Sequence, residues 1–354
     1  MVEPLPSPIT ADALDAYVGS YGPSGLSRLR LAQGHWQALA GQPGPGDPSW
    51  LSAHAGGRRL YAALEGANEL RVYDREPDGG LQLLQQRASG GSGPVHISLD
   101  TAGRHALVAH YGSGELALWA LDEQGLLAER LALRRTGEAQ GQVLPHAHMA
   151  QWDPSGRFVL CSDLGLDSLF CWRFDAAAAP TQRLAETSQR WRSASGAGPR
   201  HFRFHPRLLQ QLYLLNELDS TLVWLRLDPD SGALQAQLRL SSLPAGHRDT
   251  SYASDLLISA DGRRLYALNR LHDSIAVFAL APDGAPQLLG HEPTRGSFPR
   301  SASFSPDGRW LFTCNQRGNS ISRFALDESG WPRFQDQLTV DAPASLLLLP
   351  ALPG

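Results

Sequence analysis

The chain repeats one pattern of apolar and polar residues along most of its length. A short apolar segment is followed by a polar turn and a second apolar segment, and six copies of this unit are explicit. They begin at residues 58, 104, 157, 210, 263 and 309, so consecutive copies start 46 or 53 residues apart. Each copy has room for several short strands separated by Asp-Gly, Ser-Gly and Pro-Asp-Gly turns. Repeats of this length and strand content are typical of the blades of a β-propeller.

The two ends of the chain predict a seventh repeat that is split. Residues 14–21 match the strand that opens each copy, and residues 342–350 match the strand that precedes each copy. The C-terminal segment is then expected to be the innermost strand of a blade whose other strands come from the N-terminus, and this overlap removes free sheet edges. The sequence therefore predicts an all-β, seven-bladed β-propeller. We expect a single domain over residues 1–354, whose last blade is closed by N- and C-terminal strands.

Composition and charge argue against several classes of protein. The 354 residues include 31 basic side chains, all of them arginine, and 35 acidic ones, so a formal charge of −4 gives no broad field for nucleic acid or an anionic membrane. No apolar stretch approaches the roughly 18 residues that a transmembrane helix needs. Residues 1–10 contain no arginine and no apolar run, which predicts no secretory signal. Three cysteines are too few for a disulfide framework, so we interpret them as reduced thiols of a cytoplasmic protein. The outer strands carry no large apolar patch, so we expect a monomer.

Aligning the copies reveals unusual residues where the innermost strand of each blade begins. At one position the residues are Ser49, Val95, His148, Arg200, Ser254, Arg300 and Ala344, and at the next they are Trp50, His96, Met149, His201, Asp255, Ser301 and Ser345. In a propeller these strand starts open onto the central channel, on the face where ligands bind. Two arginines and two or three histidines at one channel mouth exceed what turns require, which predicts a binding site.

The turn after the next strand supplies a second set of candidates. They are Asp163, Asn216-Glu217, Asn269-Arg270 and Asn315-Gln316. Asn is a common choice where a turn needs a positive φ, so we interpret Asn269 and Asn315 as structural. The turn itself does not require Glu217 or Arg270, and both stay candidates for the site. His146 and His148 have the spacing to bind a metal from one face of a strand, but no third ligand follows at a diagnostic spacing.

Several phrases resemble the seven-bladed lactonase family, which includes the bacterial propeller-type 6-phosphogluconolactonase and the fungal carboxy-muconate lactonizing enzyme. The phrases are Tyr17-Val18-Gly19-Ser20-Tyr21, Gly93-Pro94-Val95-His96-Ile97-Ser98, Gly196-Ala197-Gly198-Pro199-Arg200-His201, His205-Pro206, Asn216-Glu217-Leu218, Asn269-Arg270 and Pro299-Arg300. The resemblance covers nearly the whole chain. In the fungal branch a His, two Arg and a Glu have been proposed to form the site, and the matching residues here are His148, Arg200, Glu217 and Arg270. One departure is the long polar stretch over residues 241–254, which could reshape the channel rim.

The resemblance implies hydrolysis of 6-phospho-D-glucono-1,5-lactone, a phosphorylated sugar lactone, to 6-phosphogluconate in the pentose phosphate pathway, with no cofactor and no metal. A lactone carbonyl needs an activated water and a partner for the developing oxyanion, and a phosphate needs fixed cations. Glu217 or His148 is then the expected general base. Arg200, with His201 or Arg270, is expected to stabilise the oxyanion, and Arg300 or Arg270 to hold the phosphate. His96 and Asp255 complete the expected substrate-binding residues.

Three other functions stay open on the sequence alone. A carboxy-muconate cycloisomerase would use the same arginines to bind carboxylates. A metal-dependent sugar lactonase would bind Ca²⁺ through Glu217, Asn216, Asn269 and Asp255. A non-catalytic propeller would bind a protein or a ligand without chemistry. No Gly-x-Ser-x-Gly motif is present, which argues against a serine nucleophile.

Overall fold

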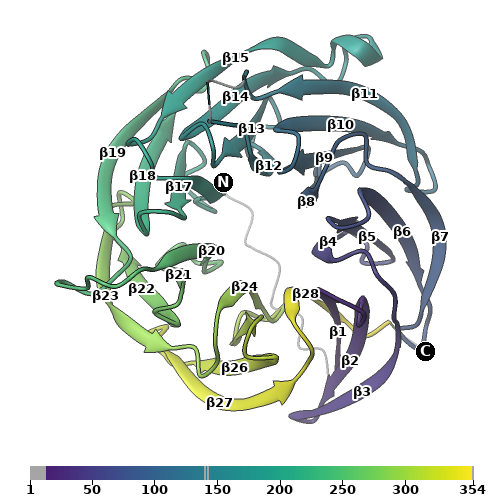
Figure 1. Ribbon diagram of the computed structural model, residues 1–354, viewed down its shortest axis with the longest axis vertical. Helices are drawn as coiled ribbons and strands as arrows, with labels where there is room; N and C mark the ends of the chain where they lie inside the picture. The colour runs from purple at the N-terminus through teal and green to yellow at the C-terminus, as the bar shows by residue number, and fades with distance from the viewer. Residues whose placement is uncertain (1–12, 139–140, 142, 353–354) are drawn as a thin grey trace, which may run out of the picture.

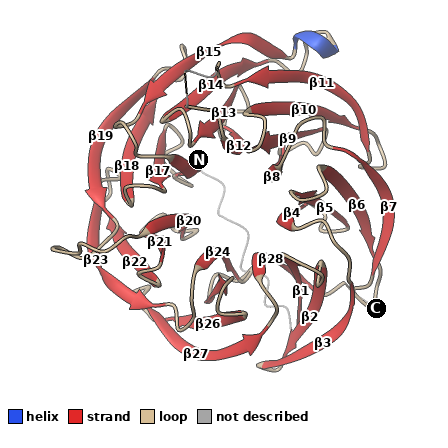
Figure 2. Cartoon of the chain, viewed as in Figure 1, coloured by secondary structure: helices blue, strands red, loops and turns tan. Residues whose placement is uncertain are grey.

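The computed structural model describes residues 13–138, 141 and 143–352, which form seven antiparallel four-stranded sheets arranged in a ring (Figure 1). Strands make up the regular structure of these residues apart from one short 3₁₀ helix, Pro180–Gln182 (Figure 2). The predicted all-β, seven-bladed propeller is confirmed. Residues 1–12, on which the predicted absence of a secretory signal rests, lie outside the described residues, as do both ends of the predicted domain.

Six blades follow one another along the chain, each from an inner strand at the channel to an outer strand at the rim. The first three contain β4 (Pro48–Ala53), β5 (Arg59–Leu64), β6 (Glu69–Arg75) and β7 (Leu81–Ala88); β8 (Pro94–Leu99), β9 (His105–His110), β10 (Glu115–Leu121) and β11 (Leu127–Arg135); and β12 (Ala147–Trp152), β13 (Phe158–Asp163), β14 (Ser168–Phe174) and β15 (Leu184–Arg192). The next three contain β16 (Pro199–Phe204), β17 (Gln211–Asn216), β18 (Thr221–Leu227) and β19 (Leu234–Ser241); β20 (Tyr252–Ile258), β21 (Arg264–Arg270), β22 (Ser274–Leu280) and β23 (Pro286–Pro293); and β24 (Pro299–Phe304), β25 (Trp310–Asn315), β26 (Ser320–Leu326) and β27 (Pro332–Thr339).

The seventh blade joins the two ends of the chain, as predicted. Its order is β28 (Pro343–Pro350), β1 (Ala13–Ser20), β2 (Leu26–Ala32) and β3 (His35–Gln42), so the C-terminal strand is innermost. β28 also contacts the inner strands β24 and β4 of the neighbouring blades. The N- and C-terminal strands therefore close the ring by ordinary antiparallel pairing.

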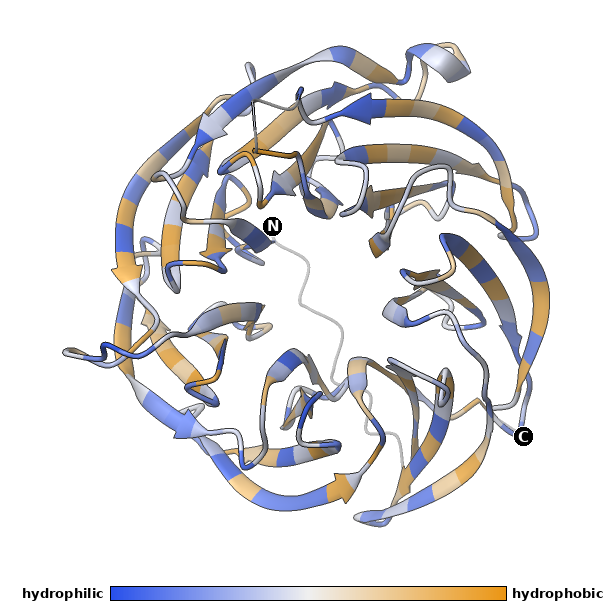
Figure 3. Cartoon of the chain, in the orientation of Figure 1, coloured by the Kyte–Doolittle hydropathy of each residue, from blue (hydrophilic) through white to orange (hydrophobic). Residues whose placement is uncertain are grey.

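The core consists of apolar clusters between neighbouring blades. Strands in the middle of a blade are buried on both faces, as in β5 and β13, whereas the outer strands alternate or are largely exposed, as in β19. Figure 3 shows hydrophobic and hydrophilic residues alternating along the outer strands. Trp172, Tyr61 and Phe278 are among the largest fully buried side chains, in agreement with the predicted core role of the recurring aromatic residues. Burial of these two-sided strands supplies the main favourable free energy of folding.

Four buried tyrosines that recur in the second strand of a blade connect adjacent blades. Each hydroxyl donates a hydrogen bond to the carbonyl of a glycine in the turn between the two outer strands of the next blade: Tyr17 to Gly79 at 2.8 Å, Tyr61 to Gly125 at 2.6 Å, Tyr213 to Gly284 at 2.5 Å and Tyr266 to Gly330 at 2.6 Å. A buried tyrosine needs such a partner for its hydroxyl. The repeated Tyr and turn-Gly positions therefore hold neighbouring blades together on the face opposite the inner-strand starts.

Candidate active site

All seven inner strands begin on the same face of the ring, and each has an irregular pairing within its first residues. In β16, pairing passes from Pro199 directly to His201, which leaves Arg200 as an extra, bulged residue. The corresponding extra residues in the other inner strands are Ser49, Val95, His148, Ser254 with Asp255, Arg300 and Ala344. A β-bulge re-aims side chains and is common beside functional sites. It allows the side chains of two consecutive residues, such as Arg200 and His201, to lie at the channel end of the strand.

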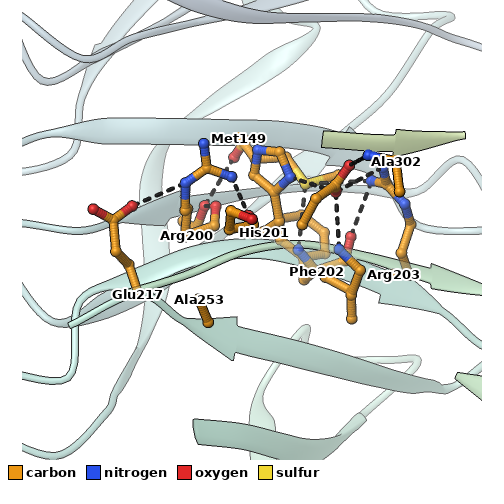
Figure 4. A network of polar contacts seen from close by, with 12 residues as sticks. Met149, Arg200, His201, Phe202, Arg203, Glu217, Ala253 and Ala302 are labelled. Atoms are coloured by element: carbon orange, nitrogen blue, oxygen red, sulfur yellow. Dashed lines mark hydrogen bonds and ion pairs between the residues drawn. The ribbon is translucent and has the colours of Figure 1, made fainter. Parts of the chain in front are cut away.

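Glu217 joins two arginines from different blades. Its Oε2 lies 2.9 Å from Nε of Arg200 and 2.9 Å from Nη2 of Arg270, and Figure 4 shows the first of these pairs. Arg200 is the second residue of β16, Glu217 follows β17 and Arg270 ends β21, so three strand ends meet here. Both arginines are almost completely buried. The structure therefore brings together three of the four predicted catalytic residues in a row with one net positive charge.

Backbone contacts hold this row in place. The Glu217 N–H donates to the carbonyl of Gly198 at 2.7 Å, and the Glu217 carbonyl accepts from Ala253 at 3.1 Å. Arg270 donates to the carbonyls of Tyr252 and Ala253 at 3.2 and 3.3 Å. The polar stretch that departs from the family pattern thus ends in direct contact with Glu217 and Arg270. Burial lowers the pKa of Arg200, Arg270 lowers it further, and Glu217 acts in the opposite direction.

Three histidines and a tryptophan pack together beside this row. The ring centre of His201 lies 5.1 Å from that of His148, 5.9 Å from that of His96 and 5.2 Å from that of Trp50. Nδ1 of His201 lies 2.8 Å from Oδ1 of Asp255, whose other oxygen accepts the N–H of Ala302 at 3.1 Å. A carboxylate at Nδ1 holds the proton on that nitrogen and leaves Nε2 as the acceptor.

Burial and surrounding positive charge keep these imidazoles neutral. Burial lowers the pKa of His148 well below its usual range, and Arg200 lowers it further. For His96, burial and Arg203 lower the pKa to about 3. Within the described part of the chain, Nδ1 of His148 has no hydrogen-bond partner. His148 is therefore a neutral imidazole with one unpaired ring nitrogen beside a group of guanidinium ions.

Arg300 comes from the blade next to that of Arg270 and has partners of its own. It donates a hydrogen bond to the hydroxyl of Tyr21, its Cζ lies 4.8 Å from that ring centre, and its Nη2 lies 3.7 Å from a carboxylate oxygen of Glu65. The Tyr21 hydroxyl in turn bonds to Glu65. The positive charge of Arg300 also lowers the pKa of His148. All eight predicted site residues thus belong to one polar region.

The sequence reasoning missed three residues of this region: Tyr21, Glu65 and Tyr111. Each directly follows the second strand of its blade, which is the position that Glu217 occupies in its own blade. The ring of Tyr111 lies 5.8 Å from that of His148. The second set of candidates covered only four blades, and continuing the same alignment through the other three would have found all of them.

A cavity of about 260 Å³ extends deeper along the inner strands. Trp50, Arg203, Leu257, Phe304 and Leu348 are among its lining residues. Trp50 also packs on His96, at 4.7 Å between ring centres, so the aromatic group separates this cavity from the arginine row. The row itself lies nearer the face where the inner strands begin.

The predicted reason for the recurring asparagines is wrong, although their structural role is confirmed. Asn216, Asn269 and Asn315 do not have positive φ; they lie at or next to the end of a strand. Their amides bridge to neighbouring polar groups, as from Asn216 to Thr221 at 2.9 Å and from Asn269 to the carbonyl of Ser242 at 2.8 Å. The residues with positive φ come later in these turns and are Ser220, Leu271, Asp273 and Asn319. Asn, Asp and Ser are common in turns, and Asn and Asp tolerate this conformation.

The two metal sets considered from the sequence are not assembled. Nδ1 of His146 bonds to the carbonyl of Tyr111 at 2.8 Å and its ring stacks on that tyrosine, whereas His148 packs on His201. Of the proposed Ca²⁺ ligands, Glu217 contacts two arginines and Asp255 contacts His201. Among the described residues, no group of three or more His, Cys, Asp or Glu is arranged to hold a metal ion.

Comparison with known proteins identifies the family. The model of the family described as "Lactonase, 7-bladed beta-propeller" matches residues 15–347. The chain is 29% identical over 266 residues to a 6-phosphogluconolactonase of Bacillus subtilis, covering 73% of this chain and 74% of that protein. It is 30% identical over 265 residues to a 6-phosphogluconolactonase of Pectobacterium carotovorum, covering 74% and 76%.

A solved structure gives the same result. The periplasmic gluconolactonase of Pseudomonas aeruginosa superposes with a TM-score of 0.86 at 25% identity, over 95% of this chain and 99% of that one. None of the helical residues described in the present structure forms a segment long and apolar enough to cross a membrane. By sequence and by fold, the chain belongs to the family of seven-bladed β-propeller lactonases.

Proposed function

We propose that this chain is a 6-phosphogluconolactonase that hydrolyses 6-phospho-D-glucono-1,5-lactone to 6-phosphogluconate without a metal or a cofactor. The observation that carries the proposal is the row of Arg200, Glu217 and Arg270 beside neutral His148. This arrangement supplies cations for a phosphorylated substrate and an acceptor for a proton of water at the same channel mouth. Two relatives bear the name of this activity.

His148 is the general base in this proposal. It accepts a proton from a water molecule whose oxygen attacks the lactone carbonyl carbon. Glu217 is less suited to this role because one of its oxygens already contacts two guanidinium groups, which stabilise the charged carboxylate. The dianionic substrate offsets the positive charge around His148, and it therefore favours the protonated imidazole that forms in the transition state.

Arg200 stabilises the oxyanion, whereas His201, whose Nε2 carries no proton to donate, only packs beside it. A fixed guanidinium in a buried site is already oriented toward developing negative charge and pays little reorganisation cost during reaction. When the tetrahedral intermediate collapses, the bond between the carbonyl carbon and the ring oxygen breaks. The ring oxygen takes the proton from His148 and becomes a hydroxyl group, and the new carboxylic acid ionises in water.

Glu217 is a positioning residue, because it holds Arg200 and Arg270 at equal distances from one carboxylate oxygen. Asp255 has the same role for His201, because its carboxylate accepts a hydrogen bond from Nδ1 of that histidine. His96 and Trp50 pack on His201 and form the apolar wall behind it. These contacts limit the rotamers of the reacting groups, which is the condition for efficient catalysis.

We further propose that the enzyme works as a monomer in the cytoplasm. Cys161, Cys171 and Cys314 are buried free thiols, which agrees with a reducing compartment. Light scattering of the purified protein and fractionation of cells test these two points separately. A stable dimer would contradict the first, and a periplasmic location, as in the Pseudomonas relative, would contradict the second.

The experiment for the proposed function measures turnover of freshly generated 6-phosphogluconolactone, with 6-phosphogluconate dehydrogenase as the coupling enzyme. The rate is compared with spontaneous hydrolysis, with and without EDTA. Arg200→Ala should lower kcat by about 10²–10³-fold, and His148→Asn by about 10²–10⁴-fold. Arg207→Ala, which changes an exposed arginine in the turn after β16, is the matched control.

An EDTA-insensitive acceleration that is lost in both site variants and kept in the control supports the proposal. Acceleration that survives His148→Asn but is lost in Glu217→Gln would transfer the base role to the carboxylate. No acceleration over the spontaneous rate would refute the activity and make muconates the next substrates to test.

A further inference from the structure

Phe298 has a backbone conformation that its side chain disfavours. It directly precedes Pro299 at the start of β24 and has φ = 62°, in the left-handed region. A bulky residue with positive φ is strained and persists only where its surroundings impose it. Such strain points to a role for the side chain that outweighs its cost.

Two other blades use glycine at the same place, and two more have the smaller residues Asp47 and Ala342 there, also with positive φ. Gly93 precedes Pro94 with φ = 61°, and Gly198 precedes Pro199 with φ = 67°. The backbone contacts are the same in all three blades. The N–H of Phe298 donates to Oδ1 of Asp273 at 2.8 Å, and that of Gly198 donates to Oδ1 of Asp167 at 2.9 Å.

The hydrogen bond to the carbonyl of this residue is also the same in these blades. Gln316 donates its N–H to the carbonyl of Phe298 at 3.0 Å, and Glu217 donates to that of Gly198 at 2.7 Å. The backbone hydrogen bonds at this position therefore form equally well with glycine, which has no side chain. The phenyl ring of Phe298 adds nothing to this network, and we look for its role elsewhere.

The ring lies against two arginines. Cζ of Arg317 is 3.7 Å from the ring centre of Phe298, and Cζ of Arg270 is 5.0 Å from it. Phe298 is half-buried and does not belong to the apolar clusters that flank its blade. Its contacts with the two guanidinium groups are cation–π interactions, which orient the planes of both groups.

These two cations carry positive charge that the protein does not neutralise locally. Arg317 is exposed in the turn after β25, and among the described residues no carboxylate lies within 4.0 Å of it. Arg270 shares its only carboxylate partner, Glu217, with Arg200. Arg317 also lowers the pKa of Arg270 through their mutual repulsion, although burial has the larger effect.

We propose that Phe298, Arg317 and Arg270 form the subsite that binds the phosphate ester of the substrate and selects phosphorylated over unphosphorylated lactones. The inference rests on the proposed function, because it assigns the carbonyl end of the same ligand to Arg200 and His148. A phosphate dianion can accept hydrogen bonds from two guanidinium groups at once, which relieves their repulsion. Phe298 holds the two groups at a fixed spacing before the ligand binds.

The chain of contacts gives the ligand a direction. Arg200 contacts Glu217, Glu217 contacts Arg270, and Arg270 contacts Phe298 beside exposed Arg317. The carbonyl is then bound at the buried end and the phosphate at the exposed end. Arg300, the other arginine expected to hold the phosphate, has the carboxylate of Glu65 at 3.7 Å, whereas Arg317 has no such partner among the described residues.

Two variants test the subsite. Arg317→Gln removes the exposed cation, and Phe298→Gly introduces the residue that two other blades have at this position. Arg173→Gln is the matched control, because Arg173 is also exposed and lies 5.1 Å from the ring centre of Phe158, in a strand hairpin on the other face. The readouts are kcat/KM for 6-phosphogluconolactone and for glucono-δ-lactone, calorimetric binding of 6-phosphogluconate and gluconate, and thermal unfolding.

Arg317→Gln and Phe298→Gly should each lower the ratio of kcat/KM for the phosphorylated lactone to that for the unphosphorylated lactone by about 10- to 100-fold. Phe298→Gly should keep or raise the Tm, since glycine accepts the left-handed backbone. The control should preserve the ratio. An equal loss on both lactones, or an unchanged ratio in both variants, overturns the subsite.

The calorimetric binding measurements distinguish a failure of the subsite from a failure of the proposed activity. If the wild-type protein hydrolyses neither lactone but binds 6-phosphogluconate more tightly than gluconate, and Arg317→Gln abolishes that preference, the subsite stands and the activity falls. If the protein hydrolyses the lactones while Arg317→Gln leaves the binding preference intact, the activity stands and the subsite is refuted.

Discussion

Replacing Glu217 with glutamine tests whether this residue organises the site or carries the chemistry. Glutamine keeps the shape of the side chain and one acceptor oxygen but removes the negative charge. The nitrogens of Arg200 and Arg270 that contact Glu217 both lie 2.9 Å from the same oxygen, so they are no more than twice that distance apart. At an effective dielectric constant of about 20, their repulsion is about 3 kcal/mol.

The loss of stability follows from this repulsion. In the wild type the carboxylate offsets it, and Glu217 is only 17% exposed, so solvent screens it weakly. Removing one partner of a buried ion pair costs roughly 3–5 kcal/mol, and we expect a value near 3 kcal/mol. With an unfolding entropy of about 2.1 cal/mol/K per residue over 354 residues, Tm falls by about 4 °C.

The assay combines thermal unfolding with kinetics. Because two uncompensated guanidinium groups attract anions, inorganic phosphate should raise the Tm of Glu217→Gln more than that of the wild type. If Glu217 only positions the arginines, kcat should fall by about 10-fold, well short of the roughly 10²–10⁴-fold loss of a general base. Glu292→Gln is the control, because Glu292 pairs with half-exposed Arg295 at 3.0 Å and should cost less than about 1 kcal/mol.

Two results would refute this reasoning. An unchanged Tm with no added response to phosphate would mean that the three charges are not coupled. A loss of kcat of about 10³-fold or more with an unchanged Tm would identify Glu217 as the general base in place of His148.

Acid should destabilise the fold, because burial holds the pKa of His96 at about 3 and that of His148 well below its usual range. The unfolded chain binds the His96 proton near pH 6.5 and the folded chain does not, so for His96 stability should fall with decreasing pH by about 1.4 kcal/mol per pH unit between roughly pH 6 and 4, and His148 acts in the same direction. Urea unfolding of His96→Gln should give a shallower pH dependence, and an identical slope would contradict the assignment. Tyr61→Phe removes the hydrogen bond to Gly125 of the next blade and should cost about 1 kcal/mol in urea unfolding, whereas no change would show that this inter-blade contact is not stabilising.

Much of the fold was predictable because its determinants are local and repeated. Apolar alternation and Gly or Asp turn residues act over a few positions, and six copies of the same pattern reinforce one interpretation. Even the closure of the ring was predictable, since residues 342–350 have the pattern of the strand that precedes each copy. The same alignment selected His148, Arg200, Glu217 and Arg270, because equivalent positions in a propeller face the same channel.

What the sequence could not supply was the pairing of side chains across the ring. Arg300 contacts Tyr21 from a position 279 residues later in the chain, and these residues meet only because β28 pairs with β1. The alignment likewise cannot show that Glu217 contacts two arginines at once, because that depends on the angle between neighbouring blades.

Backbone strain also depends on tertiary structure. The sequence alone determined a seven-bladed propeller with an arginine- and histidine-rich channel mouth, since repeat, turn and alternation signals depend on near neighbours. Only the tertiary structure decided which charges are paired and which stay free, and it revealed that Phe298 occupies a left-handed position where two other blades have glycine. Coulombic pairing and positive φ are set by the distances and contacts that packing imposes, and these bring together residues far apart in the chain.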